Sequence, residues 1–193
     1  ETLLCPTCCL ELKALSGTGC VRCGRPGVVP TAAGWCRDCV GRDLGFRSAR
    51  SAYAYEGVAQ GLVAALKYGG QRRVAHVMAE LAAQSLLALV DLLPSAGITW
   101  VPCHPRVERE RGYNQAELFA RSLAERVGLK AVAPPVRKVV HTRHQQSLGR
   151  EERARNLEGA FAPMPRDHDG ALGSSIVLVD DGSTTGATTG HVA

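Results

Sequence analysis

Two groups of residues in this sequence have the types and the spacing for chemistry. Three Cys-x-x-Cys pairs, CPTC, CVRC and CRDC, lie within the first 39 residues. Near the other end, residues 176–189 read IVLVDDGSTTGATT, so that two aspartates follow an apolar run and precede glycines and hydroxyl side chains. The first group suggests a metal site, and the second suggests a site for a polar, phosphorylated ligand.

The cysteine pairs are spaced as metal ligands. A Cys-x-x-Cys turn directs two thiolates at one point, and two such turns make a tetrahedral site that suits zinc. Twelve residues separate the second pair from the third, and Gly24 follows the second, as in a zinc ribbon. We therefore predict structural zinc bound by Cys20, Cys23, Cys36 and Cys39. The alternatives are a redox dithiol and thiols that bind nothing.

The first cysteine pair is left without a partner pair. Cys5 and Cys8 could replace one pair of the quartet, bind a second metal with ligands from elsewhere, or stay free, and Cys9 could substitute for either. Cys103 follows a strand-like segment, and we expect a buried or site-lining thiol with no assigned role. A secreted disulfide scaffold is not indicated, because the paired cysteines are confined to one end and share one spacing.

The acid and hydroxyl stretch has the order of groups that a sugar phosphate needs. Carboxylates such as Asp180 and Asp181 can accept hydrogen bonds from vicinal sugar hydroxyls or hold hydrated Mg²⁺. A tight, glycine-containing turn with exposed N–H groups and hydroxyls can hold a phosphate. The stretch therefore indicates a phosphorylated pentose, with its ribose at the aspartates and its 5′-phosphate at residues 183–188. The alternative is an acidic surface turn; the nucleotide-binding pattern that ends in Gly-Lys-Ser/Thr is absent.

These residues need a scaffold, and the hydrophobic pattern supplies one. Strands are predicted at residues 51–55, 98–102, 136–140 and 176–179. Helices are predicted from Val58 to the Gly69-Gly70 pair, over residues 74–93, and over residues 118–127 up to Gly128, with a surface loop at 166–175. This alternation predicts an α/β domain around a mainly parallel sheet. In such a sheet the ligand site lies beyond the carboxyl ends of the strands, where Asp180 and Asp181 would sit.

Composition is compatible with this scaffold. The chain has 193 residues, 45% of them hydrophobic, which is enough for one substantial core and a small appended module. No apolar run approaches the roughly 20 residues of a membrane-spanning helix, and no signal peptide is recognisable, so we expect no membrane insertion and a cytoplasmic location. The formal net charge of +5 permits a nucleic acid or a phosphorylated small molecule as partner without requiring either.

The stretch at 176–189 resembles the phosphoribosyl pyrophosphate (PRPP) loop of type I phosphoribosyltransferases. Further segments narrow the resemblance to the ComF family of competence-associated, phosphoribosyltransferase-like proteins. They are the cysteine pairs, LKYGG (66–70), VPCHPRVERERGYNQAELFA (101–120) and HTRHQQSLGREERARNLEGAF (141–161), which follow in the family's order. The resemblance covers nearly the whole chain.

The resemblance implies a role for each motif. Asp180 and Asp181 would bind the ribose hydroxyls and act in catalysis, and PRPP would be bound together with Mg²⁺. The 5′-phosphate would be bound by Ser183, Thr184, Thr185, Gly186, Ala187 and Thr188. Residues 101–105 would form the loop that contacts pyrophosphate. Residues 1–45 would be a zinc-ribbon module and residues 46–193 the phosphoribosyltransferase-like domain.

The sequence also departs from the family pattern. The family usually has a further cysteine pair upstream of Cys5 and Cys8, whose absence would leave those thiols without partners. Gly182 and Ser183 stand where the family tends to have bulkier residues. Only GHVA follows the loop, whereas the fold normally continues with a helix and a strand, so we expect the domain to lack both elements.

The middle of the chain contributes polar side chains to the expected site. Guanidinium and amide groups suit pyrophosphate, and they occur together as Arg109, Arg111, Asn114 and Gln115. Lys67 could reach a phosphate or could simply complement the dipole of the helix that it ends. For His104 we expect packing rather than catalysis.

These observations lead to two functional predictions. The first is a PRPP-binding, phosphoribosyltransferase-like protein acting in natural competence or DNA uptake, which would transfer a phosphoribosyl group with Mg²⁺ if it is an enzyme. The alternative is a non-catalytic zinc-ribbon adaptor that binds single-stranded DNA or competence proteins. A third possibility is a redox protein that uses Cys5 and Cys8.

Overall fold

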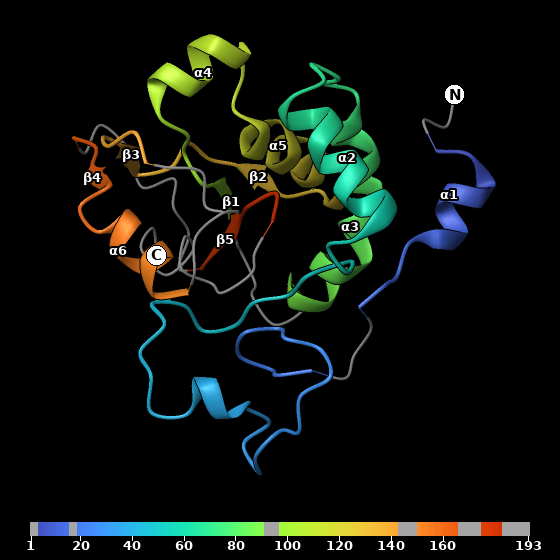
Figure 1. Cartoon of the computed structure of the whole chain (residues 1–193), viewed down its shortest axis with the longest axis vertical. Coiled ribbons are helices and arrows are strands. Elements are labelled where there is room, and N and C mark those ends of the chain that lie inside the picture. The colour runs from blue at the N-terminus through green and yellow to red at the C-terminus, as the bar shows by residue number, and fades with distance from the viewer. Residues whose placement is uncertain (1–3, 16–18, 91–96, 143–149, 166–174, 183–193) are drawn as a thin grey trace.

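The computed structural model describes residues 4–15, 19–90, 97–142, 150–165 and 175–182 (Figure 1). Its elements, in chain order, are α1 (Pro6–Glu11), the 3-10 helix η1 (Arg37–Cys39), α2 (Gly57–Lys67), α3 (Val74–Val90), β1 (Gly97–Trp100), α4 (Pro105–Arg111), α5 (Gln115–Val127), β2 (Lys130–Ala131), β3 (Val136–Lys138), α6 (Arg150–Leu157), β4 (Phe161–Pro163) and β5 (Ile176–Val179). None of the helices within the described ranges is long and apolar enough to cross a membrane.

The main sheet has three parallel strands in the order β2-β1-β5. β1 is the central strand: Gly97 to Trp100 pair with Ile176 to Val179 on one side, and Gly97 and Ile98 pair with Lys130 and Ala131 on the other. All four residues of β1 are buried, as is typical of a parallel strand covered on both faces. The prediction of a mainly parallel sheet is confirmed, and the carboxyl ends of β1 and β5 lie side by side.

Helices α3 and α5 pack against each other beside this sheet and form the main core. The core contains Ile98 and Trp100 of β1, Val179 of β5, and Phe119 and Leu123 of α5. α5 ends before Gly128 as predicted, where Gly128 takes the left-handed conformation, but it begins at Gln115, three residues earlier than predicted, because Asn114 caps its first turn. The helix therefore has fixed ends, and its first turn lies next to the end of β1.

Several boundaries differ from the prediction. Residues 51–55 form no strand, because only Tyr53 forms a β-bridge, with Ala14. β3 is three residues long and pairs antiparallel with β4, which was not predicted, so this hairpin lies outside the parallel sheet. β2 and α4 were not predicted either. The end of the predicted helix at 91–93 and nearly all of the predicted loop at 166–175 lie outside the described residues.

α1 lies beside α2, whereas the rest of the cysteine-rich segment lies at one end of the molecule (Figure 1). A small cluster of Cys20, Cys36 and Cys39 forms its interior. Hydrogen bonds attach the segment to the next part of the chain: the Ala49 N–H donates to the Arg22 carbonyl at 2.8 Å, and the Arg50 guanidinium donates to the Val21 carbonyl at 2.9 Å. The segment is thus bonded to the chain that leads into α2.

Candidate functional site

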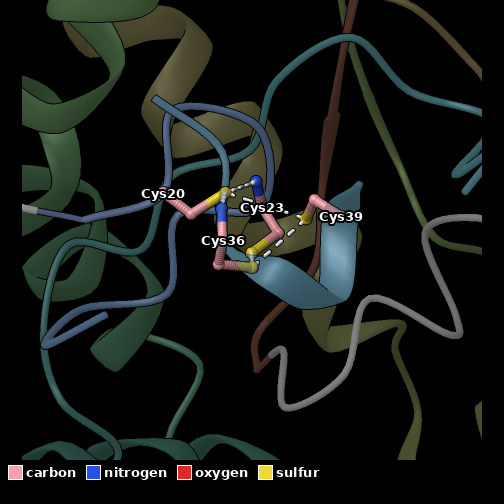
Figure 2. Close-up of side chains that lie close together, drawn as sticks. All are labelled: Cys20, Cys23, Cys36 and Cys39. Atoms are coloured by element: carbon pink, nitrogen blue, oxygen red, sulfur yellow. Dashed lines mark hydrogen bonds between the residues drawn. The ribbon is translucent and has the colours of Figure 1, made fainter. Parts of the chain in front are cut away.

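The four predicted zinc ligands converge on one point (Figure 2). The sulfur atoms of Cys20, Cys23, Cys36 and Cys39 all lie within 4.8 Å of one another. The separations are 3.7 Å for Cys20 and Cys39, 3.8 Å for Cys23 and Cys36, and 3.5 Å for Cys36 and Cys39. Zinc–sulfur bonds of about 2.3 Å in a tetrahedron place the sulfur atoms about 3.8 Å apart, so the four thiols fit a zinc ion.

Local backbone geometry prepares this cluster for a cation. The N–H groups of Cys36 and Cys23 point at the Cys20 sulfur, at 3.2 and 3.5 Å. Burial alone would raise the pKa of Cys20, but these N–H groups and that of Arg22 lower it to about 6. A thiolate is therefore available at neutral pH, and a zinc ion would stabilise the remaining three.

Gly24 is needed for the close approach of the chain behind the cluster. Its φ is +72°, and a Cβ at this position would lie 2.6 Å from the carbonyl oxygen of Ala49. A glycine after the second cysteine pair therefore lets residues 49 and 50 pack against the turn that holds Cys20 and Cys23. Cys5 and Cys8 do not join the cluster: Cys5 caps α1, with the Cys8 N–H 3.4 Å from its sulfur. Their binding of a second metal stays a prediction.

The second group of residues lies at the carboxyl end of β5. Asp181 is buried, with its side chain 2% exposed, and the ammonium nitrogen of Lys67 lies 2.5 Å from its Oδ2 atom. The Gln115 amide donates to Oδ1 of Asp181 at 3.1 Å, and Arg111 donates to the carbonyl oxygen of the Gln115 side chain. The segments LKYGG and RGYNQ thus meet the aspartate pair, although they lie far apart in the sequence.

The aspartates and Lys67 change one another's ionisation. Burial and repulsion from Asp181 raise the pKa of Asp180 to about 8, against the attraction of Lys67. Burial would lower the pKa of Lys67, but attraction by Asp181 and Asp180 outweighs it and raises the pKa. At neutral pH the lysine is therefore a stable cation, and Asp180 is the carboxyl that is most easily protonated.

Hydrogen bonds join the end of α2 to the start of α5 near the aspartate pair. The Tyr113 hydroxyl donates to the Leu66 carbonyl at 2.5 Å, and Arg72 donates to the Gly112 carbonyl at 3.0 Å. The side chain of Asn114 is used twice: its oxygen accepts from the Ala116 N–H at 3.0 Å and its nitrogen donates to the Val101 carbonyl at 3.1 Å. Asn114 therefore joins the start of α5 to the end of β1.

The other predicted site residues have different surroundings. Arg109 is exposed on α4 and takes no part in these contacts. His104 caps α4 by accepting from the Arg106 N–H at 3.2 Å, a role that was not predicted. Burial and Glu108 raise the pKa of Cys103 to about 11, which makes its thiol a poor nucleophile at neutral pH. The predicted phosphate-binding residues, 183–188, lie outside the described residues.

Two residues of the site, Lys67 and Tyr113, could hardly be assigned their contacts from the sequence. The ion pair between Lys67 and Asp181 was not predicted, because a lysine at the end of a helix fits the helix dipole equally well. Tyr113 lies within a quoted motif, but nothing local shows that its hydroxyl reaches α2. In both cases the partner comes from a distant part of the chain, so only the assembled fold reveals the contact.

A cavity of about 1120 Å³ lies between the cysteine-rich segment and the sheet. Asp180, Asp181 and Gly182 line it on the side of β5, while Asp38, Cys39 and Arg42 line it on the side of the cysteine cluster. The acid pair and the zinc module thus border the same space.

Known proteins with a similar sequence are named as competence or DNA utilization proteins. The chain is 29% identical to the DNA utilization protein YhgH of Salmonella typhimurium over 178 residues, which are 90% of this chain and 75% of that protein. It is 27% identical to the competence protein ComFC of Bacillus subtilis, over 96% of this chain and 74% of that protein. It is 33% identical to the competence protein F of Haemophilus influenzae, over 52% of this chain and 43% of that protein. No family model and no solved structure matches the chain.

Proposed function

Because this chain belongs to the ComF family, we propose that it acts in natural competence or DNA uptake as a PRPP-binding protein with a phosphoribosyltransferase-like fold. The biological role follows the names of the relatives, which are competence and DNA utilization proteins. The ligand follows from the sequence and from the position of the acid pair.

One observation carries the ligand assignment. Asp180 and Asp181 stand at the carboxyl end of β5, beside the end of β1, which is where an open parallel sheet binds its ligands. Asp180 is half-buried rather than fully enclosed and can accept hydrogen bonds from ribose hydroxyls. Arg111, which donates to the Gln115 side chain beside Asp181, adds positive charge near the acid pair, as a phosphorylated ligand requires.

The 5′-phosphate and the pyrophosphate of PRPP are proposed to lie on opposite sides of the two aspartates. Residues 183–188 bind the 5′-phosphate through N–H and hydroxyl groups. The pyrophosphate, with its Mg²⁺, lies toward Arg109, Arg111, Asn114 and Gln115. If the protein is an enzyme, a nucleophile forms a bond to C1′ of the ribose while the bond from C1′ to pyrophosphate breaks. The carboxylates favour the positive charge that develops on the sugar.

The cysteine quartet has a structural role in this proposal. Residues 1–45 form a zinc-ribbon module, and residues 46–193 form the ligand-binding domain. A zinc ion on Cys20, Cys23, Cys36 and Cys39 would replace the hydrophobic core that a segment of this size lacks. The wall of the shared cavity is then fixed by metal binding rather than by packing alone.

Calorimetric titration of the zinc-loaded protein with PRPP tests the ligand assignment. We expect saturable binding that Mg²⁺ strengthens and that Asp180→Asn/Asp181→Asn weakens at least about tenfold, because a hydrogen bond to a charged group contributes about 1.5–3 kcal/mol. Glu125→Gln, which removes an exposed carboxylate from α5, is the matched control and should bind like the wild type. A folded wild-type protein that gives no heat and no thermal stabilisation with PRPP would overturn the assignment.

A second candidate function is a zinc-ribbon adaptor for single-stranded DNA. It is favoured by exposed arginines on the zinc module and just after it, including Arg37, Arg42 and Arg47, and by the Arg22 guanidinium 4.7 Å from the centre of the Trp35 ring. Phosphate contacts release counterions, so affinity for DNA should fall steeply with salt. Arg37→Gln/Arg47→Gln should reduce this salt dependence while Asp180→Asn leaves it unchanged. Equal loss of DNA binding in both variants would contradict the adaptor.

A further inference from the structure

The two neighbouring aspartates have unequal surroundings. Both carboxylate oxygens of Asp181 face protein groups: Oδ2 faces the Lys67 ammonium at 2.5 Å, and Oδ1 accepts from the Gln115 amide at 3.1 Å. Its side chain is only 2% exposed. Asp180 is only half-buried, and its Oδ1 accepts from the N–H of Asp181 at 2.9 Å, while its side chain also interacts with the side chain of Asp181. The available acceptor positions are therefore those of Asp180.

The partners of Asp181 are themselves held in place. Arg111 donates to the side-chain oxygen of Gln115, which leaves the NH₂ group of that amide facing Asp181. Lys67 is the last residue of α2, and the carbonyl of Leu66 before it accepts the Tyr113 hydroxyl. Asp181 thus forms an ion pair with the end of α2 and a hydrogen bond with the start of α5.

We infer that Asp180 alone contacts the ribose, and that Lys67 with Asp181 is a positioning pair that fixes the tip of β5 against α2. This inference rests on the proposed phosphoribosyl site. Lys67 also attracts Asp180, so without Asp181 it would compete with the ligand for Asp180. As long as Asp181 neutralises Lys67, the side-chain oxygens of Asp180 are left for the ligand.

A stability cycle tests the positioning pair without any ligand. Lys67→Met and Asp181→Asn each leave one buried group without its counter-charge, so each should lower the melting temperature by about 6 °C or more, and the double variant should recover most of that loss. The control is the exposed pair of Lys13 and Glu56, whose nitrogen and oxygen lie 2.8 Å apart. Lys13→Met and Glu56→Gln should show almost no coupling. Additive effects at positions 67 and 181 would overturn the positioning role.

Binding of Mg²⁺ and PRPP tests the division between the acids. Asp181→Asn should weaken binding, because Lys67 then pairs with Asp180 and competes with the ribose. Adding Lys67→Met should restore about tenfold or more of the lost affinity, since the competitor is gone. Asp180→Asn should lose affinity that Lys67→Met does not restore. If Asp181 itself contacted the ribose, or Lys67 the phosphate, the double variant would bind no better than Asp181→Asn, and the inference would be wrong.

The two readouts separate this inference from the proposed function. If the folded wild-type protein binds neither PRPP nor ribose 5-phosphate, the proposed function fails, and with it the assignment of Asp180 to the ribose. The stability cycle would still decide whether Lys67 and Asp181 act as a positioning pair. If the wild type binds and the double variant is stable but does not bind, the ligand assignment stands and the division between the acids is overturned.

Discussion

Asp180 is the residue whose ionisation departs most from its ordinary behaviour among the acids of the site. Burial and repulsion from Asp181 raise its pKa to about 8, and Lys67 only partly offsets them. The folded state therefore binds a proton at Asp180 more tightly than the unfolded chain does. By linkage, stability from this residue is fully present below the unfolded pKa of about 4 and is lost as pH rises toward 8.

This ionisation gives a prediction that separates Asp180 from the other groups. Asp180→Asn should be more stable than the wild type at pH 9 and should lose that advantage toward pH 4, with a change of at most about 1.4 kcal/mol per pH unit. Urea unfolding of both proteins between pH 4 and pH 9 measures the difference. Glu125→Gln should show no such trend, and a constant difference for Asp180→Asn would contradict the raised pKa.

Single residues also show what the sequence could and could not predict. The quartet of cysteines was predicted because the spacing of metal ligands is a local property of the chain. The acid pair was predicted for the same reason, since an apolar run followed by two aspartates is visible in the sequence. The ion pair of Lys67 with Asp181 joins α2 to the end of β5, and no local pattern contains both residues.

At the scale of elements, the start of α5 is the feature that positions the site. Asn114 caps the helix and bonds to the end of β1, while the next residue, Gln115, reaches Asp181. Asn114→Ala should therefore destabilise the protein by about 1–3 kcal/mol, because it removes a cap and leaves a buried carbonyl unpaired.

Asn114→Ser separates the two effects of this side chain. Serine keeps an oxygen for the cap but loses the amide that bonds to Val101, so its stability in urea unfolding should lie between those of the wild type and the alanine variant. Equal stability of all three proteins would show that α5 is held by packing alone.

Elements were predicted well where their pattern is long or strong. β5 is four apolar residues in a row, and α5 has an apolar face and a glycine after its last turn, so both were found from sequence. β2 has two residues and β4 has three, which is too short for any periodicity. Residues 51–55 alternate like a strand, but their short partner segment allows only the bridge of Tyr53 with Ala14.

At the scale of the whole molecule, the cysteine cluster and the acid pair border the same cavity. Loss of zinc would leave four thiols together in a segment that has only a small core. Cys39→Ala should abolish zinc retention and unfold the cysteine-rich segment, since a structural zinc contributes about 10 kcal/mol or more. Elemental analysis and protease resistance measure the two effects.

Cys5→Ala is the control for this experiment. Cys5 is exposed and lies outside the cluster, so its removal should leave the zinc of the quartet in place. Loss of that zinc in Cys5→Ala would show that the first pair replaces one pair of the quartet, as the sequence alone allowed.

The parallel pairing of β1 with β5 also bears on how the protein is made. β1 pairs with β2 and packs on α5, all of which leave the ribosome well before β5. Until β5 emerges, Lys67 has no counter-charge from Asp181, and the central strand has an open edge. A nascent chain can therefore fold its helices before β5 is synthesised, and the acid pair joins them only after that.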